Sequence, residues 1–363
     1  MRKLESNWTR FNRNSLSGIG LIVCSIILFV AVLGYYIMPD SAPNANTMNL
    51  ALGSKDPGFS VKGIEIISST EAVNFGSKLI NGETPSFEFI PIDSFYFSDT
   101  EISVFSYDGE AGINGIKQDY KFAEIKDYVV TNTSSIVVKE KQFYLGTDRF
   151  GRDLLSRLIL GARISFAVGF MAVFISVFIG VSVGLIAGYF GGWVDNLVSW
   201  LINVIWSLPA LLLVIALSFA LGKGFMQVFI AIGLSMWVEV ARIVRGQVLG
   251  VRNLEFVEAG KALGFGDFRI VVKHILPNIL GPLLVIATSN FASAILLEAG
   301  MSFLGYGAQP PTPSWGNMIK ENYAYITVGA WHLALFPGLA IMALVFSFNM
   351  IAVGLRDVFG LRD

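Results

Sequence analysis

The sequence has little of what catalytic and metal sites are usually built from. Its 363 residues include one cysteine, Cys24, and two histidines, His274 and His332, so no disulfide can form within one chain. No Cys/His motif accompanies the histidines, and we therefore expect no bound metal. Cys24 lies in an apolar run, where a thiol is typically a small packing residue. No Ser-His-Asp or paired-carboxylate arrangement can be argued from the spacing.

Charge is also scarce. Charged residues make up 15% of the chain, against about 25% in soluble proteins, and 26 basic residues nearly balance 27 acidic ones. A chain without a basic excess is not expected to bind nucleic acid. The nearest approach to a phosphate-binding loop, Gly222-Lys223-Gly224, lacks the spacing and the hydroxyl of that motif. We therefore predict that this chain binds no ATP and no other cofactor.

Hydrophobic residues, at 54% of the chain, form runs long enough to cross a lipid bilayer. The first run, 17–38, exceeds the 7–15 apolar residues typical of a signal peptide, and no cleavage site follows it. We predict a retained helix whose N-terminus lies inside the cell, because positive charge precedes it. Those basic residues are Arg2, Lys3, Arg10 and Arg13.

Five further membrane helices are predicted from hydropathy, at about 164–189, 197–221, 225–245, 278–297 and 331–354. Six spans place both termini in the cytoplasm. Small residues in the second helix favour close helix packing: Gly169, Gly180, Gly184 and Gly188. Pro209 should kink the third, which makes Ser207–Ala210 a candidate for the path of a transported molecule; a simple packing kink is the alternative. In the fourth, Arg242 can pair with Glu239, and we favour this structural pair over a substrate contact.

Between the first two helices, residues 39–143 are polar and rich in proline. Strand patterns occur at 59–67, 86–92, 94–106 and 127–138, and no stretch is long enough to span a membrane. We expect a small, mostly β domain outside the cytoplasm. Its role as a spacer, a lid or a docking surface stays open.

Residues 144–163 should form an interfacial segment. Leu154, Leu155, Leu158 and Ile159 supply an apolar face, and we expect the arginines to extend toward the lipid headgroups. The four arginines at 149, 152, 157 and 163 favour a cytoplasmic position, whereas the helix count places them outside. We follow the helix count, because Asp148 and Asp153 neutralise part of the charge.

The longest polar interruption among the later helices is 252–277. It has the pattern of two short helices: Asn253 can cap the first, Gly264 can end it, and Asp267 can cap the second before Pro277. One stripe of the first helix combines large and small residues, namely Phe256, Ala259, Gly260 and Leu263. From these residues alone, a docking surface and a plain connecting loop are both possible.

This stretch resembles the EAA loop of ABC importer permeases. The resemblance rests on Glu258-Ala259-Gly260, then Gly264 after three intervening residues, then Leu276-Pro277. Gly260 replaces the usual second alanine, and His274 stands where the family has isoleucine. The resemblance implies a coupling helix that docks on a separate ATPase subunit. The residues it assigns to coupling are Phe256, Glu258, Ala259, Gly260, Leu263, Gly264, Leu276 and Pro277.

Two other segments, 145–165 and 302–316, resemble the C-type subunit of the dipeptide/oligopeptide (and nickel) branch of that family. In the second we read a proline-rich interfacial loop with Trp315 at headgroup depth. The resemblance implies the type I membrane fold in a bacterial inner membrane, and one half of a path that works by alternating access. It also implies a sister permease, an extracytoplasmic substrate-binding protein and two ATPase subunits that carry ATP and Mg²⁺. Peptide, nickel chelate and other solutes stay open as substrates.

The predicted organisation is therefore an all-α polytopic membrane protein with a β insertion. It comprises 1–38, the insertion 39–143, the interfacial segment 144–163, the permease domain 164–357 and a tail 358–363. Two other functions are possible in principle. An autonomous channel or ion-driven transporter would need ionisable residues deep in the bilayer, which are few. A membrane-anchored sensor would use the 39–143 domain to bind a ligand.

Overall fold

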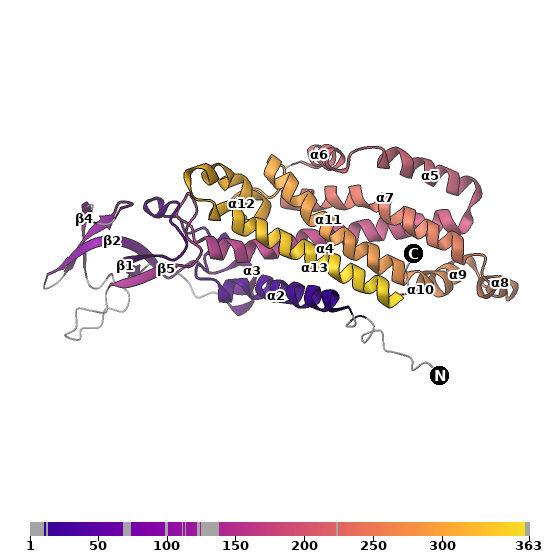
Figure 1. Cartoon of the computed structure of the whole chain (residues 1–363), viewed down its shortest axis with the longest axis horizontal. Helices are drawn as coiled ribbons and strands as arrows, with labels where there is room; N and C mark the ends of the chain where they lie inside the picture. The colour runs from indigo at the N-terminus through magenta and orange to yellow at the C-terminus, as the bar shows by residue number, and fades with distance from the viewer. Residues whose placement is uncertain are drawn as a thin grey trace, which may run out of the picture.

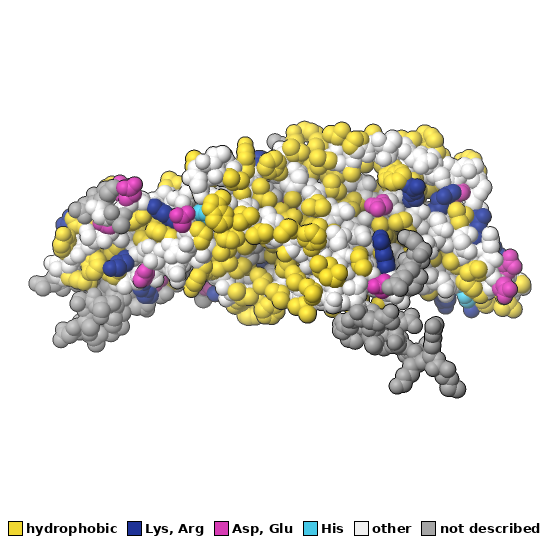
Figure 2. All heavy atoms as spheres, in the orientation of Figure 1, with side chains coloured by type: hydrophobic (Ala, Val, Ile, Leu, Met, Phe, Trp, Pro, Cys, Tyr) yellow, Lys and Arg dark blue, Asp and Glu magenta, His cyan; other side chains and the backbone are white. Residues whose placement is uncertain are grey.

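The computed structural model describes residues 11, 14–67, 74–98, 101–110, 112, 114–121, 124, 138–222 and 224–359. A bundle of long helices makes up most of the molecule, with a small sheet at one end and the short helix α8 (Glu255–Ala262) at the other (Figure 1). We refer to these as the insertion end and the loop end. Hydrophobic side chains cover the middle of the bundle, and charged ones gather toward both ends (Figure 2). This distribution is expected of a protein whose middle lies in lipid.

Among the described residues, five helices and one bent helix pair are candidates to cross a membrane. Five single helices are long and apolar enough to cross a membrane: α2 (Ser15–Ile37), α4 (Leu154–Phe190), α7 (Phe225–Val251), α11 (Leu280–Leu304) and α13 (His332–Phe359). The sixth is a bent pair, α5 (Gly192–Trp206) and α6 (Ala210–Leu221), whose axes differ by 94°. The predicted fold class, a six-span permease with a small β insertion, is confirmed.

Two of these spans differ from the sequence prediction. The second helix begins at Leu154, ten residues before the expected start, because Asp153 Oδ2 accepts the Ser156 N–H at 2.8 Å and caps it. The expected interfacial segment 144–163 is thus a loop followed by the first turns of α4. The third helix is broken rather than kinked, since Pro209 lacks an N–H to continue the ladder and instead precedes α6.

Small residues bring α4 and α7 together, and the predicted close packing of the second helix is thereby confirmed. A Cβ built on Gly180 would lie 2.5 Å from Val240 Cβ, and one on Gly188 would lie 2.6 Å from Val248 Cβ. Gly184 meets the carbonyl of Ala241 in the same way, at 2.7 Å. No side chain fits at these positions, so glycine sets the separation of the two helices.

The insertion is a five-stranded antiparallel sheet in the order β4-β3-β2-β1-β5. Its strands are β1 (Phe59–Ile67), β2 (Phe87–Phe97), β3 (Glu101–Tyr107), β4 (Asn114–Lys121) and β5 (Lys139–Phe143). Ile64, Ile92, Ile102 and Val104 form its core. The expected strand 94–106 was wrong, because the run splits into β2 and β3, which pair Phe97 with Ile102. The expected strand 127–138 lies outside the described residues except for Val138.

The sheet is joined to the bundle through backbone and side-chain hydrogen bonds. Thr147 Oγ1 accepts the Lys55 N–H at 2.9 Å, and the Asp148 carbonyl accepts the Ser54 N–H at 2.9 Å. Two 3-10 turns, Pro43–Ala45 and Leu50–Leu52, line this junction. A short helix, α3 (Phe75–Asn81), lies beside α2, where Phe75 contacts the ring of Tyr36.

At the insertion end, α12 (Trp315–Asn322) and a 3-10 turn (Tyr323–Val328) precede α13. The expected headgroup position of Trp315 was wrong. Its side chain is 2% exposed, and its Nε1–H donates to the Leu158 carbonyl of α4 at 2.9 Å. Trp315 packs directly on Gly161, where a Cβ would clash with the indole. The tryptophan therefore fastens α12 to α4 instead of meeting lipid.

Candidate functional site: a helical loop and two polar clusters

The short helix α8 follows α7 after a tight turn. α7 ends at Val251 and α8 begins at Glu255, so Leu254 occupies the N-cap position. The expected cap by Asn253 is therefore not formed. Glu255 and Glu258 lie in the first turn, where the helix dipole favours anions. The start of α8 thus depends on charge rather than on a side-chain cap.

The end of α8 is a Schellman motif. Gly264 has a φ of 77°, its N–H donates to the Lys261 carbonyl at 2.9 Å, and the Phe265 N–H donates to the Gly260 carbonyl at 3.1 Å. This is the bond pattern that glycine supports just past a helix. The predicted stop at Gly264 is present, and it turns the chain sharply toward the next helix.

Three of the four residues in the predicted stripe of α8 are exposed, and the fourth is buried. Phe256 and Leu263 are 39% and 72% exposed, and Ala259 is also exposed. Gly260 is buried, so its expected place on the docking stripe was wrong. A Cβ on Gly260 would lie 3.5 Å from the Phe265 ring, because the Schellman turn folds Phe265 back over it.

The second half of the loop is irregular. It comprises α9 (Asp267–Ile270), a π-helical turn (Val271–Ile275) and α10 (Leu276–Asn278). The wide turn comes just before Pro277, whose missing N–H interrupts the α-helical ladder. Pro277 is exposed and Leu276 is half-buried. Ile270 and Ile275 are fully buried, with Val257 of α8, in a cluster that includes Val244 and Val248 of α7.

Polar contacts tie this loop to the long helices. The Tyr189 hydroxyl of α4 donates to Asp267 Oδ1 at 2.6 Å, so Asp267 binds Tyr189 instead of forming the expected cap. Lys261 Nζ lies 5.6 Å from the centre of the Tyr189 ring. At the base of the loop, Arg252 Nη1 donates to the Gly188 carbonyl at 2.9 Å. No local sequence pattern predicts these contacts, because they join segments more than 60 residues apart.

A second connection fixes the turn between α4 and α5. Arg245 of α7 and Asp195 of α5 form a two-pronged ion pair, with Nη2 to Oδ2 at 2.7 Å. A planar guanidinium matched to a carboxylate in this way is geometrically specific. These contacts link the loop ends of α4, α5 and α7 to the base of α8.

A buried ion network occupies the insertion end. Arg152 Nε donates to Asp148 Oδ2 at 2.6 Å, and its Nη2 donates to Glu321 Oε2 of α12 at 3.1 Å. Arg157 lies 3.6 Å from the same Asp148 oxygen. The side chains of both arginines are only 2% exposed, so the expectation that they extend to the headgroups was wrong. Two arginines and two carboxylates balance, which allows the burial.

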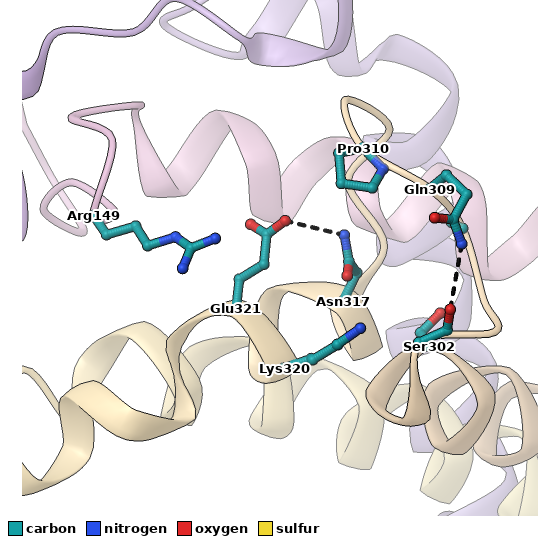
Figure 3. A pocket seen from close by; sticks show the side chains of 9 residues that line it. Arg149, Ser302, Gln309, Pro310, Asn317, Lys320 and Glu321 are labelled. Carbon is teal, nitrogen blue, oxygen red and sulfur yellow. Dashed lines mark hydrogen bonds between the residues drawn. The ribbon is translucent and has the colours of Figure 1, made fainter.

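An open pocket lies beside this network (Figure 3). Glu321 projects into it and accepts a hydrogen bond from Asn317 at 3.3 Å, while Arg149 and Lys320 stand on either side of that carboxylate. Arg149 Cζ lies 4.5 Å from the Phe150 ring. Because Arg152 already pairs with Glu321, the pocket carries surplus positive charge.

The predicted Glu239–Arg242 pair of α7 is not formed. The Arg242 guanidinium instead lies 4.0 Å from the ring of Trp206, at the end of α5. Trp206 directly precedes the break between α5 and α6, where the predicted kink residues Ser207 and Pro209 lie exposed. Arg242 therefore reaches the kink rather than its own helix neighbour.

Known proteins resemble this chain in sequence. Residues 180–362 match the family described as binding-protein-dependent transport system inner membrane component. The dipeptide transport system permease DppC of Alkalihalophilus pseudofirmus is 43% identical over 231 residues, 63% of this chain and 76% of that protein. The glutathione transport system permease GsiD of Escherichia coli is 42% identical over 216 residues, 60% of this chain and 71% of that protein. A solved methionine ABC transporter, MetNI, in an inward-facing conformation aligns with a TM-score of 0.47 at 22% identity, covering 58% of this chain and 98% of that one. With the matched family model covering half of the sequence and α8 within it, the chain belongs to the binding-protein-dependent transport family, the membrane permeases of ABC importers.

Proposed function

We propose that this chain is the permease subunit of a peptide importer and forms one half of its translocation path. The observation that carries the proposal is α8, a helix that exposes Phe256 and Leu263 at one end of a membrane bundle while its other face is buried. Exposed apolar side chains on a helix braced from behind suit insertion into a groove of a partner protein. Relatives named as dipeptide and glutathione permeases support a peptide as the substrate.

We infer that the loop end, and with it both chain termini, faces the cytoplasm. Basic residues are concentrated there, as the positive-inside rule requires: Arg245, Arg252, Lys261, Arg269, Lys273 and Arg356. Two of the arginines at the insertion end, Arg152 and Arg157, do not oppose this orientation, because Asp148 and Glu321 neutralise them. The sheet then lies outside the cytoplasm.

The partners follow from this orientation. Two ATPase subunits, which carry ATP and Mg²⁺, bind at the loop end, one of them on α8. A sister permease completes the path, and a substrate-binding protein delivers the peptide at the insertion end. ATP hydrolysis belongs to the ATPases, so this chain is a transport subunit without a cofactor of its own.

Mechanical coupling runs from α8 into the bundle. A displacement of α8 pulls on α4 through Tyr189 and Asp267, and on α7 through the buried contacts of Val257, Ile270 and Ile275. Because glycines hold α4 and α7 together, both helices tilt as one body. That tilt is the motion by which ATPase closure alternates access to the path.

The test is assembly and activity of the complete transporter with Leu263→Asp. The variant should insert and pair with the sister permease normally but lose most of the bound ATPase. Leu50→Asp is the matched control, since Leu50 is 76% exposed at the opposite end, against 72% for Leu263. Normal ATPase binding and peptide uptake by Leu263→Asp would remove α8 as the docking helix. A chain that purifies without any ATPase would overturn the importer function itself.

A further inference from the structure

Two charged side chains of α7 lie exposed in the middle of a membrane span. At 1.5 Å per residue, α7 is about 40 Å long, and Glu239 and Arg242 lie about 21 Å and about 26 Å from its start. Both side chains are exposed on the surface of the chain. Charged groups at this depth are costly unless they face protein or a water-filled cavity. This face of α7 therefore does not meet lipid.

Glu239 and Arg242 are also left without partners of opposite charge. Among the described residues, Glu239 makes no hydrogen bond or ion pair, and Arg242 has its ring contact with Trp206 alone. Stacking on Trp206 fixes the guanidinium plane but leaves its N–H edge free for a carboxylate. One acidic and one basic group, three residues apart on the helix, are thus available to bind a charged ligand.

The break between α5 and α6 lies at the same depth. Because Arg242 contacts Trp206, the non-helical residues 207–209 are beside it, inside the span. Backbone outside a helix is tolerated at membrane depth only where it is buried in protein or lines a water-filled cavity. Asn203 and Ser207 add exposed polar groups at this place.

The opposite kind of surface is present on α2. Its large exposed side chains are all hydrophobic or aromatic, and include Ile19, Ile22, Ile26 and Phe29. The exposed fraction of Ile26 is 57%, so this side of the bundle is as open as the α7 face. The molecule thus has one lipid-facing side and one side with polar groups at mid-depth.

We propose that Glu239 and Arg242 line the translocation path and bind the two ends of a peptide, its ammonium group at Glu239 and its carboxylate at Arg242. This rests on the proposed function as a peptide permease half. A peptide with free termini is a zwitterion, so its charges complement those of the pair and the bound state is neutral. The Trp206 face and the α5–α6 break provide the rest of the wall, with no charge to select a side chain. The site would therefore read the ends of a peptide and not its sequence.

The experiment uses the complete transporter in membranes, with Cys24→Ser and single replacements Glu239→Cys, Arg242→Cys or Ile26→Cys as the lipid-face control. A water-soluble methanethiosulfonate reagent should modify the first two thiols at least ten times faster than the third. Dialanine in excess should slow the modification of both path thiols several-fold. Equal labelling of Ile26→Cys and Glu239→Cys would overturn the path assignment.

Dipeptides with one blocked terminus then show which residue binds which end of the peptide. Glu239→Cys keeps Arg242, so N-acetyl-dialanine should protect it and dialanine amide should not. Arg242→Cys keeps Glu239, so the pattern should reverse. If neither capped peptide protects its thiol, or if both thiols cross-link to the sister permease, the two residues form a contact between subunits and do not bind the peptide. If a cysteine variant fails to assemble, peptide uptake is measured for Glu239→Gln and Arg242→Gln instead. Uptake should fall in both variants, and unchanged uptake would exclude the proposed site. Loss of ATPase binding in the parent would instead count against the proposed function.

Discussion

Tyr189, the penultimate residue of α4, donates a hydrogen bond of 2.6 Å to Asp267 in the loop behind α8. The first turn of the same helix carries Arg157, which lies in the ion network with Asp148 and Glu321. One helix therefore has polar connections to both ends of the molecule. A displacement at the loop end can reach the α12 region without passing through a flexible segment.

Replacing Tyr189 by phenylalanine should loosen the connection between α8 and α4. The substitution removes the hydrogen bond to Asp267 but keeps the ring beside Lys261. A hydrogen bond of this kind contributes about 0.5–1.5 kcal/mol, so we expect a several-fold fall in peptide taken up per ATP hydrolysed. Tyr144→Phe is the control, because Tyr144 is 59% exposed at the insertion end. Unchanged coupling in Tyr189→Phe would show that α4 is not driven through this contact.

Gly260→Ala should be tolerated, even though Gly260 is buried. The new Cβ would lie 3.5 Å from Phe265, an ordinary contact, and alanine favours a helix by about 1 kcal/mol over glycine. We expect a small rise in melting temperature with transport retained. Gly264→Ala, by contrast, should lower stability by about 1 kcal/mol, because its φ is 77°. Equal melting temperatures for the two variants would contradict the Schellman geometry.

Gly184→Leu should separate α4 from α7. A side chain at this position meets the Ala241 carbonyl at 2.7 Å and Val244 Cβ at 2.8 Å, so the helices must move apart. Overpacking of this kind typically costs about 1–3 kcal/mol, and more where backbone is in the way. Thermal melting in detergent measures it, with Gly246→Leu as the control, since open space surrounds Gly246 on α7. Equal melting temperatures for the two variants would contradict the close contact between α4 and α7.

Arg152→Gln should strongly destabilise the insertion end. It leaves Asp148, which is 2% exposed, and Glu321, which is 11% exposed, without their closest cation, and such losses cost about 3–5 kcal/mol. Arg149→Gln, an exposed arginine nearby, should change stability by less than about 0.5 kcal/mol. Protease resistance of the outer segments, compared between the two variants, checks the difference. Similar resistance would mean that the network does not hold α12 in place.

The features predicted correctly from the sequence are those that depend on local pattern. Hydropathy located the candidate spans, glycine spacing indicated that the second helix packs closely against its neighbours, and Gly264 marked the end of α8. The failures depend on distant partners. Arg152 is buried because Glu321, 169 residues away, meets it. Gly260 faces inward because Phe265 folds over it, and Arg242 turns from Glu239 because Trp206 of another helix offers a better contact.

The length of α4 has a further consequence for the shape of the assembly. Its 37 residues span about 55 Å, whereas the hydrocarbon of a bilayer is about 30 Å thick. Part of this helix therefore lies outside the acyl chains unless it is steeply tilted, and its first turns are the part that contacts the ion network and α12. The charges of that network are excluded from water by the protein itself, because Asp148, Arg152 and Arg157 are each 2% exposed within this one chain. If the excess length of α4 lies at this end, a soluble protein can bind the insertion end without contacting the membrane.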